Sequence, residues 1–425
     1  MSSTLDKSLV KKIDELQEFS INTIKEMVSI PTPVPPGENY KEFVEYANSV
    51  LKDIGIKTEI IEVPKSILKQ NIPEMADYPR YILIGRVKGN SENPVVHFNG
   101  HYDVVPPGEG WNVTAPFVPN IIENKIYGRG TADMKGGIVS AIAAIKALLE
   151  LDIELNGSIE ISMTPDEEIG GLCGAKYLIE NKFVNPDYVI IPEPSGYDRI
   201  WIGHKGVLWG EITVYGKAAH ASVPWNGINA FEKTVNLANV LFKELKPKVE
   251  NKFTEYNVDV PEGKRATIVI GSIVRGGIKT NVVPDKVVFQ FDRRILPEEK
   301  FDNVVAEVIE AIEKAKEQDP ELKADFKTLL RADPAVTPPE AKIVCELKEA
   351  VKSLINKEPK LTLSTGFLDM RFFVKAGYQT VSYGPGEISQ AHVANEYLEI
   401  DKMMLVSKVF GLFIKNVLKG GEKDE

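Results

Sequence analysis

Six histidine and carboxylate side chains lie near the ends of apolar segments of this sequence, where they could bind metal ions. Imidazole nitrogens and carboxylate oxygens are typical ligands of Zn²⁺ and similar cations. The set holds more carboxylates than one tetrahedral ion uses, so it predicts two metal ions. The six residues are His101, Asp133, Glu167, Glu168, Glu193 and His392.

The segment "FNGHYDVVPPGEGWN", from Phe98 to Asn112, begins this set with a histidine and an aspartate two positions apart. Residues two apart in an extended segment face the same side, so Asp103 can orient the ring of His101, as carboxylates beside metal-binding histidines do. An ordinary polar turn would explain either residue alone. The pair favours a metal site over a turn.

The segment "GRGTADMKGG" has the glycines of a phosphate-binding loop but not its spacing. It also carries Asp133, a negative charge that would repel a phosphate. We therefore predict that Asp133 is a metal ligand.

Glu167 and Glu168 are adjacent, and adjacent glutamates are often only a solvated acidic pair. These two follow the apolar run "SIEISMT" and precede Gly170 and Gly171. We therefore expect different tasks for them, with one binding metal and the other taking up a proton.

The elements around the six residues predict an α/β fold. Short β-rich runs alternate with helical patterns before residue 205 and again after residue 331, which indicates a mostly parallel central sheet flanked by helices. The carboxyl ends of strands line the ligand crevice of such sheets, so the six residues can converge. Between these two parts the predicted order is βαββαβ, as in ferredoxin-like domains. We predict one domain formed by residues 1–205 and 332–425, and an inserted domain of residues 206–331.

The composition argues against several classes of protein. The chain has 51 basic and 61 acidic side chains, a net charge of -10, and no basic stripe, so nucleic acid is not an expected partner. No apolar run has the length of a membrane-spanning helix, and the amino-terminal segment lacks the features of a secretory signal. We therefore predict a cytoplasmic protein with no membrane partner. The two cysteines, Cys173 and Cys345, are far apart and suggest no thiolate zinc site.

Five motifs, in order over most of the chain, resemble those of the two-zinc aminoacylase and carboxypeptidase family. This family includes acetylornithine deacetylase, succinyl-diaminopimelate desuccinylase and glutamate-releasing carboxypeptidases. The resemblance implies two Zn²⁺ ions per subunit, with Co²⁺ or Mn²⁺ as substitutes, and a homodimer formed through a ferredoxin-like lid domain. The motifs are "HYDVVP", "GRGTADMKGG", "TPDEEIGG", "IPEPSG" and "GPGEISQAH".

The resemblance also implies a role for each metal ligand. Asp133 would bridge the two ions. His101 and Glu193 would complete one site, and Glu168 and His392 would complete the other.

Three further residues would act in catalysis. The resemblance implies that Glu167 is the general base and that Asp103 is the partner of His101. His220, in "GKAAHAS", is our candidate donor to the tetrahedral oxyanion, because it opens a lid loop and the resemblance implies that it reaches the site of the partner subunit. The alternative is that His220 is a solvent-exposed loop residue.

A free carboxylate on the substrate calls for arginine, whose planar fork binds both oxygens. The two candidate arginines, Arg294 and Arg371, could instead form structural ion pairs. Phe367, Leu368 and Ile388 stand where the desuccinylase pattern has polar residues, so we expect an apolar acyl group or side chain. The candidate substrate-binding residues are Arg294, Asn281, Arg371 and Gly366.

These observations predict a metal-dependent hydrolase that cleaves the amide bond of N-acyl amino acids through a metal-activated water. A carboxypeptidase or dipeptidase is the nearest alternative, because deacylation and peptide hydrolysis break the same kind of bond. A metal-stabilised binding protein without turnover is a remote alternative. Such a protein would be expected to lack a ligand or the base, whereas this chain has the whole set.

Overall fold

The structure is a computed structural model that describes residues 4–419. The chain divides into two compact units. The first unit runs to Gly203 and also contains Thr337–Leu361 and the residues from Leu368 on; the second unit consists of His204–Val336 and Thr362–Phe367. The short segment Thr362–Phe367 belongs to the second unit, although the predicted range 332–425 contains it. Its backbone hydrogen bonds explain this, because Leu363 N donates to Asn257 O at 2.9 Å.

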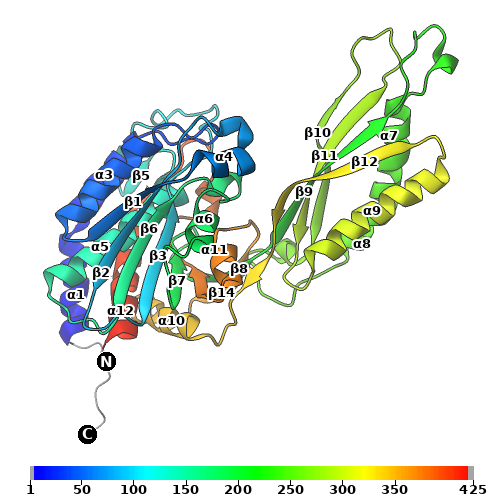
Figure 1. Ribbon diagram of the computed structural model, residues 1–425. Helices are drawn as coiled ribbons and strands as arrows, with labels where there is room; N and C mark the ends of the chain where they lie inside the picture. The colour runs from blue at the N-terminus through cyan, green and yellow to red at the C-terminus, as the bar shows by residue number, and fades with distance from the viewer. Residues whose placement is uncertain (1–3, 420–425) are drawn as a thin grey trace. The chain divides into compact units, whose positions relative to one another are not determined.

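The first unit is built on a mixed sheet with the strand order β1-β2-β6-β3-β7-β15-β8 (Figure 1). The pairs β6–β3, β3–β7 and β7–β15 are parallel, whereas β1–β2, β2–β6 and β15–β8 are antiparallel. The sheet is therefore parallel only in its middle. The predicted α/β class is confirmed. The strands are β1 Lys57–Glu62, β2 Tyr81–Lys88, β3 Val95–His101, β6 Ser158–Thr164, β7 Tyr188–Ile191, β8 Arg199–His204 and β15 Gln379–Ser382.

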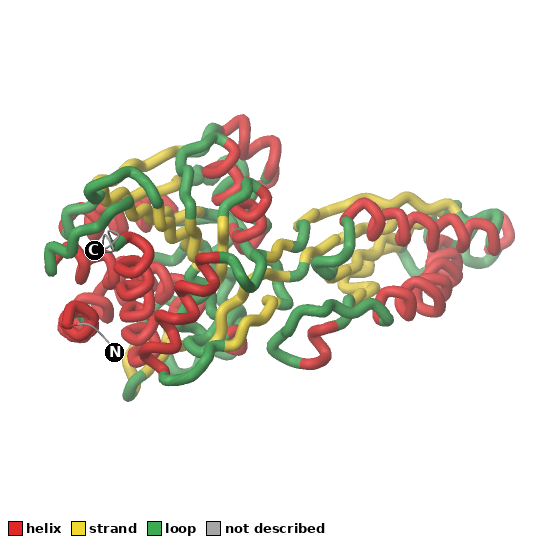
Figure 2. The backbone as a smooth tube through the Cα atoms, turned by 90° about the horizontal axis from the view of Figure 1, so that it is seen from below, coloured by secondary structure: helices red, strands yellow, loops and turns green. Residues whose placement is uncertain are grey.

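Helices cover both faces of this sheet (Figure 2). Ile82 and Ile84 of β2 share a buried cluster with residues of the helices α4, α6 and α11. Gly85, the residue after Ile84, faces the other way, where a Cβ would lie 3.0 Å from Leu51 of α3. On that side α5 is buried almost all round, as its nearly uniform apolar sequence requires. The helices are α1 Thr4–Glu15, α2 Gln17–Ser29, α3 Tyr40–Asp53, α4 Lys65–Asn71, α5 Gly136–Glu150, α6 Ala175–Glu180, α10 Lys342–Ile355, α11 Met370–Lys375 and α12 Ile400–Leu418.

A small sheet of three short antiparallel strands, in the order β16-β5-β4, joins the end of the chain to the segment before α5. Its pairing brings the loop that carries His392 toward the turn that carries Asp133. Its strands are β4 Asn120–Ile122, β5 Lys125–Tyr127 and β16 Tyr397–Glu399.

The second unit has the predicted βαββαβ order, with an antiparallel sheet in the order β10-β11-β9-β12. Alternate residues of β11, including Phe289 and Phe291, face a core shared with Leu237 of α7 and Ile312 of α9. The elements are β9 Gly206–Tyr215, α7 Ala230–Val240, α8 Lys246–Glu250, β10 Thr267–Gly276, β11 Lys286–Ile295, α9 Phe301–Gln318 and β12 Lys323–Ala332. The short strands β13 Ala335–Val336 and β14 Lys360–Ser364 follow in the chain, and both belong to the nine-stranded sheet that contains β8.

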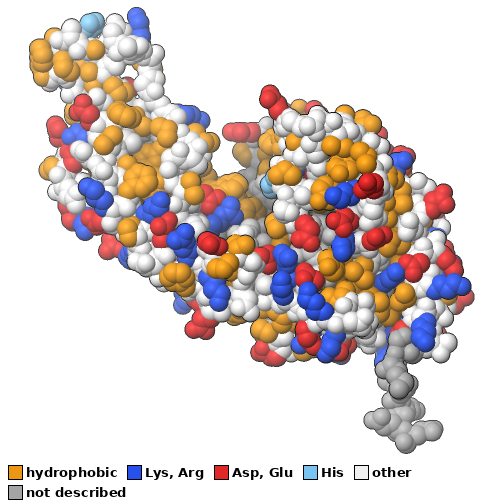
Figure 3. All heavy atoms as spheres, turned by 180° about the vertical axis from the view of Figure 1, so that it is seen from behind, with side chains coloured by type: hydrophobic (Ala, Val, Ile, Leu, Met, Phe, Trp, Pro, Cys, Tyr) orange, Lys and Arg blue, Asp and Glu red, His pale blue; other side chains and the backbone are white. Residues whose placement is uncertain are grey.

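Both units carry hydrophobic side chains at their surfaces (Figure 3). Within residues 4–419, no helix combines the length and the apolar composition that crossing a membrane requires. A cytoplasmic location stays a prediction.

Candidate metal centre

Parallel strands place the candidate residues at one edge of the first unit's sheet. His101 is the last residue of β3, and Glu167 begins a short 3₁₀ turn, Glu167–Ile169, shortly after β6. Glu193 lies two residues after the end of β7. Because β6, β3 and β7 run in the same direction, these carboxyl ends meet, as expected for the ligand crevice of an α/β sheet.

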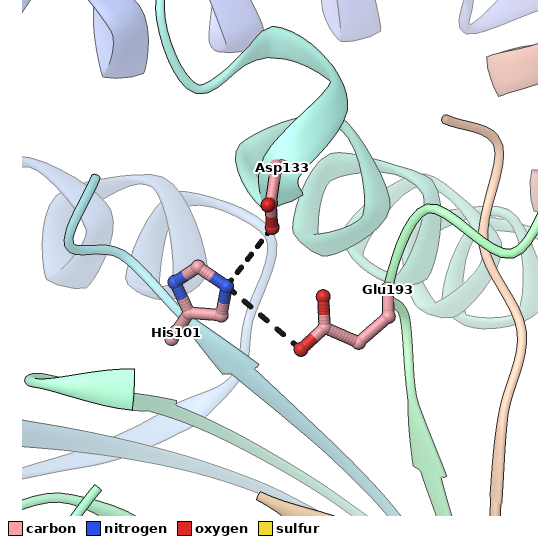
Figure 4. A group of neighbouring side chains, drawn as sticks. All are labelled: His101, Asp133 and Glu193. Carbon is pink, nitrogen blue, oxygen red and sulfur yellow. Dashed lines mark hydrogen bonds and ion pairs between the residues drawn. The ribbon is translucent and has the colours of Figure 1, made fainter. Parts of the chain in front are cut away.

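His101, Asp133 and Glu193 form the first group of possible metal ligands (Figure 4). His101 Nε2 lies 3.1 Å from Asp133 Oδ1 and 3.8 Å from Glu193 Oε1. All three residues are buried, and their ligand atoms lie within 4.8 Å of one another. The three side chains point toward a common centre.

Asp133, Glu168 and His392 form the second group. His392 Nε2 lies 3.5 Å from Asp133 Oδ2 and 3.0 Å from Glu168 Oε2. The His392 side chain is 54% exposed, so this group is open to solvent on one side. Asp133 belongs to both groups and directs a different oxygen to each histidine.

Asp133 is presented by the turn Thr131–Lys135, which leads into α5. The glycines after this turn permit close packing. A Cβ on Gly137 would collide with the carbonyl oxygen of Pro192, the residue before Glu193. Only glycine therefore allows the start of α5 to lie against the segment that carries Glu193.

Asp103 contacts both His101 and the turn Glu167–Ile169, which we call the glutamate turn. His101 Nδ1 lies 3.0 Å from the main-chain oxygen of Asp103 and 3.6 Å from its carboxylate Oδ1. The carboxylate itself accepts the backbone N–H groups of Glu167 and Glu168. The imidazole is thus oriented mainly by the backbone of Asp103, and the side chain holds the turn.

The electrostatics of the centre show an excess of negative charge. Burial raises the pKa of Glu193 to about 7, despite the nearby His101. Burial, reinforced by Glu193, raises the pKa of Glu167 well above its usual value. Hydrogen bonds to Asp133 and Glu168 raise the pKa of His392 to about 10. Bound cations would offset this charge and leave the imidazoles neutral, as ligands must be.

Two buried oxygens support the fit of metal ions. Among the described residues, Glu193 Oε1 and Glu167 Oε1 have no hydrogen-bond partner. A buried carboxylate oxygen without a partner is costly, and a cation or a water molecule would satisfy it. Nitrogen and oxygen donors of this kind suit Zn²⁺, Co²⁺ and Mn²⁺.

The remaining predicted residues lie in other places. In the second unit, His220 is exposed, and its Nδ1 lies within hydrogen-bonding distance of Ser222 Oγ, at 2.7 Å. The main-chain oxygen of Asn281 accepts the N–H of Ala221, the residue after His220. Arg294 pairs with Asp292, with Nε 2.8 Å from Oδ1. The role of these residues at the centre stays a prediction.

Arg371 and Gly366 were also predicted to contact substrate. Arg371 is buried, and its guanidinium donates to the main-chain oxygens of Leu368 and Gly170, each at 2.7 Å. These bonds connect α11 to the end of the glutamate turn. Gly366 donates its N–H to Ser364 Oγ at 3.2 Å.

Two buried ion pairs beside the centre were not predicted from the sequence. Arg80 Nε lies 2.8 Å from the carboxylate of Asp166, the residue before Glu167, and both side chains are almost fully buried. Arg129 Nη1 lies 2.7 Å from Glu396, whose carboxylate also contacts the turn that carries Asp133. Their positions in loops gave no periodic signal, and their partners are remote in sequence.

Known proteins resemble this chain over most of its length. Residues 97–416 match the sequence profile of peptidase family M20/M25/M40. An uncharacterized metallohydrolase of Methanocaldococcus jannaschii is 30% identical over 423 residues, which cover 94% of this chain and 100% of the relative. A succinyl-diaminopimelate desuccinylase of Nautilia profundicola is 30% identical over 404 residues, with 92% and 97% covered. A solved dipeptidase of Saccharomyces cerevisiae has a TM-score of 0.78 at 18% identity, with 97% of this chain and 98% of that chain covered, which shows the shared fold.

Proposed function

Because this chain belongs to peptidase family M20/M25/M40 and is a metal-dependent amidohydrolase, we propose that it releases amino acids from N-acyl amino acids. One observation carries the proposed site: the two oxygens of Asp133 face different histidines, His101 at 3.1 Å and His392 at 3.5 Å. A carboxylate shared in this way suits a bridge between two metal ions.

The proposed ligands follow from the two groups. Asp133 would be shared by two ions, His101 and Glu193 would complete one Zn²⁺ site, and Glu168 and His392 would complete the other. Two bound cations would polarise the scissile carbonyl and lower the pKa of a nearby water toward neutrality. Co²⁺ or Mn²⁺ would serve with the same donor atoms.

Glu167 is the proposed general base. Its Oε1 is buried without a hydrogen-bond partner among the described residues, and burial raises the pKa of this carboxyl well above its usual value. A carboxylate of raised pKa accepts a proton from water more readily and then gives it to the departing amine nitrogen. Asp103 fixes the turn on which Glu167 lies.

The substrate is proposed to carry an apolar acyl group or side chain. Ile388 and Val393 lie on either side of His392 in the sequence, and they are 45% and 43% exposed. Exposed aliphatic side chains in the segment that carries the exposed ligand His392 would offer an apolar contact. Arg294, Arg371, Asn281 and Gly366 remain candidates for contact with the substrate.

We also propose a homodimer formed by the second unit, in which His220 reaches the partner's site. The strand β10 is at the edge of its sheet, and Val269, Ile273 and Val274 on it are 58%, 47% and 59% exposed. An exposed apolar edge strand is prone to pair with another chain. Phe231 and Phe242, in the helical segment that follows β9, are also exposed, at 56% and 47%.

A panel of N-acetyl and N-succinyl amino acids and of dipeptides, assayed with added Zn²⁺ or Co²⁺, tests the proposed substrate. We expect the highest kcat/KM with N-acyl amino acids that have apolar groups. Preference for dipeptides or for peptides with a free carboxyl end would instead support the dipeptidase or carboxypeptidase alternative. Preference for an N-succinyl substrate with a charged side chain would contradict the apolar site.

A further inference from the structure

Glu396 is a fully buried carboxylate with no part in the proposed chemistry. It lies in the loop between His392 and β16, and it is 0% exposed. A buried carboxylate is costly unless hydrogen bonds and an opposite charge satisfy it. Its partners therefore indicate what it does in the fold.

The four donors to the Glu396 carboxylate come from one short segment of the chain. Oε2 accepts Arg129 Nη1 at 2.7 Å and the backbone N–H of Gly130 at 3.0 Å. Oε1 accepts the backbone N–H groups of Ala132 at 2.8 Å and Asp133 at 3.1 Å. The carboxylate thus spans the start of the turn, and one of its bonds is to the proposed bridging ligand itself.

Arg129 is held from other directions. Its Nη2 donates to Pro107 O at 3.2 Å, its guanidinium carbon lies 5.3 Å from the ring centre of Trp111, and its backbone N–H donates to Pro116 O at 2.7 Å. Arg129 is 2% exposed. These contacts hold the guanidinium of Arg129 in place, and the backbone donors of the turn hold the carboxylate of Glu396.

Glu396 also ties the turn to the loop of the second histidine. It follows His392 by four residues, and its main-chain oxygen accepts the N–H of Gly128 at 2.9 Å. His392 Nε2 and Asp133 Oδ2 are 3.5 Å apart. One residue therefore connects the segments that carry two of the three side chains in the second group.

We propose that Glu396 is a positioning residue that holds Asp133 and the His392 loop in the geometry that binds metal, chiefly at the group of Asp133, Glu168 and His392. This inference rests on the proposed two-metal site. Groups that orient metal ligands typically contribute about 10- to 100-fold in metal affinity. Glu396→Gln keeps the size of the side chain, but its amide nitrogen would face N–H donors and would not balance Arg129.

The test is a titration of metal-free protein with Co²⁺ in competition with a chelator, read by the visible absorption of bound cobalt. For Glu396→Gln we expect one of the two bound ions to be weakened about 10- to 100-fold and the other to change less. Glu299→Gln is the matched control, because Glu299 is also largely buried and accepts Arg293 Nη2 at 2.6 Å and the Leu296 N–H at 3.0 Å, but it lies in the second unit. That control should bind both ions as the unchanged protein does.

The outcomes separate this inference from the proposed function. If unchanged protein binds no cobalt, the two-metal site is wrong. If unchanged protein binds two ions and Glu396→Gln binds both equally well, the positioning role is wrong. If Glu396→Gln does not fold, Glu396→Asp carries the test, because its shorter side chain cannot reach from Arg129 to the Asp133 N–H; unchanged affinity in that variant would equally overturn the inference.

Discussion

Asp103 Oδ1 accepts the backbone N–H of Glu167 at 3.2 Å, and Oδ2 accepts that of Glu168 at 3.1 Å. One buried carboxylate therefore holds the turn that carries the proposed base and a proposed ligand. The same residue orients His101 through its main-chain oxygen. Asp103 connects the first ligand group to the turn of the second.

Asp103→Asn should disturb this turn, because the amide nitrogen would face an N–H donor. We expect kcat to fall about 10- to 100-fold and the free energy of unfolding to fall by about 1–3 kcal/mol. Steady-state kinetics and urea unfolding measure the two effects. Asp187→Asn is the control, since the exposed Asp187 also accepts a backbone N–H, that of Val95, at the opposite ends of the strands. Equal behaviour of the two variants would refute the role of Asp103.

Glu167→Gln should keep both metal ions and lose turnover. The amide has nearly the same shape but cannot take a proton, so kcat should fall by about 10²- to 10⁴-fold. Kinetics and metal analysis on the same preparation check this prediction. A rate close to that of the unchanged enzyme would exclude Glu167 as the base.

Arg80→Met should destabilise the first unit, because it leaves Asp166 buried without its cation. We expect a loss of about 3–5 kcal/mol in the free energy of unfolding, measured in urea. Lys65→Met is the control, because it breaks an exposed ion pair with Asp77 and should cost at most about 1 kcal/mol. Similar losses in both variants would show that the buried Arg80–Asp166 pair contributes no more to the free energy of unfolding than an exposed pair does.

His220→Ala should lower kcat about 10²- to 10³-fold without loss of metal, if His220 stabilises the oxyanion. A mixed dimer tests whether it acts on the partner's site. In a mixed dimer of one Glu167→Gln and one His220→Ala subunit, one of the two sites has both intact groups, so isolated mixed dimers should show about half of the normal activity. A mixed dimer as inactive as its parents would place His220 in its own subunit's site or outside catalysis.

The sequence predicted the α/β class and the gathering of the candidate residues for a physical reason. The apolar runs that end at His101 or shortly before Glu167 and Glu193 are strands, and the carboxyl ends of parallel strands meet at one edge. The direction of β1 and β2 could not be predicted in this way, because alternation of apolar residues is the same in parallel and antiparallel strands.

The buried carboxylates beside the two ligand-bearing turns, Glu396 and Asp166, could not be predicted from the sequence. Glu396 and Asp166 are charged residues in loops, where a solvated side chain is the usual expectation. Their burial depends on Arg129 and Arg80, which are 267 and 86 residues away. Such pairs appear only when the tertiary structure brings remote segments together.

The number of metal ions per chain tests the central claim most directly. The claim is that Asp133 serves two ions at once, one with His101 and Glu193 and the other with Glu168 and His392. Elemental analysis of purified protein should give close to two equivalents of transition metal, about one in His392→Ala, and loss of activity when a chelator removes the metal. Full activity in a metal-free preparation would contradict the account.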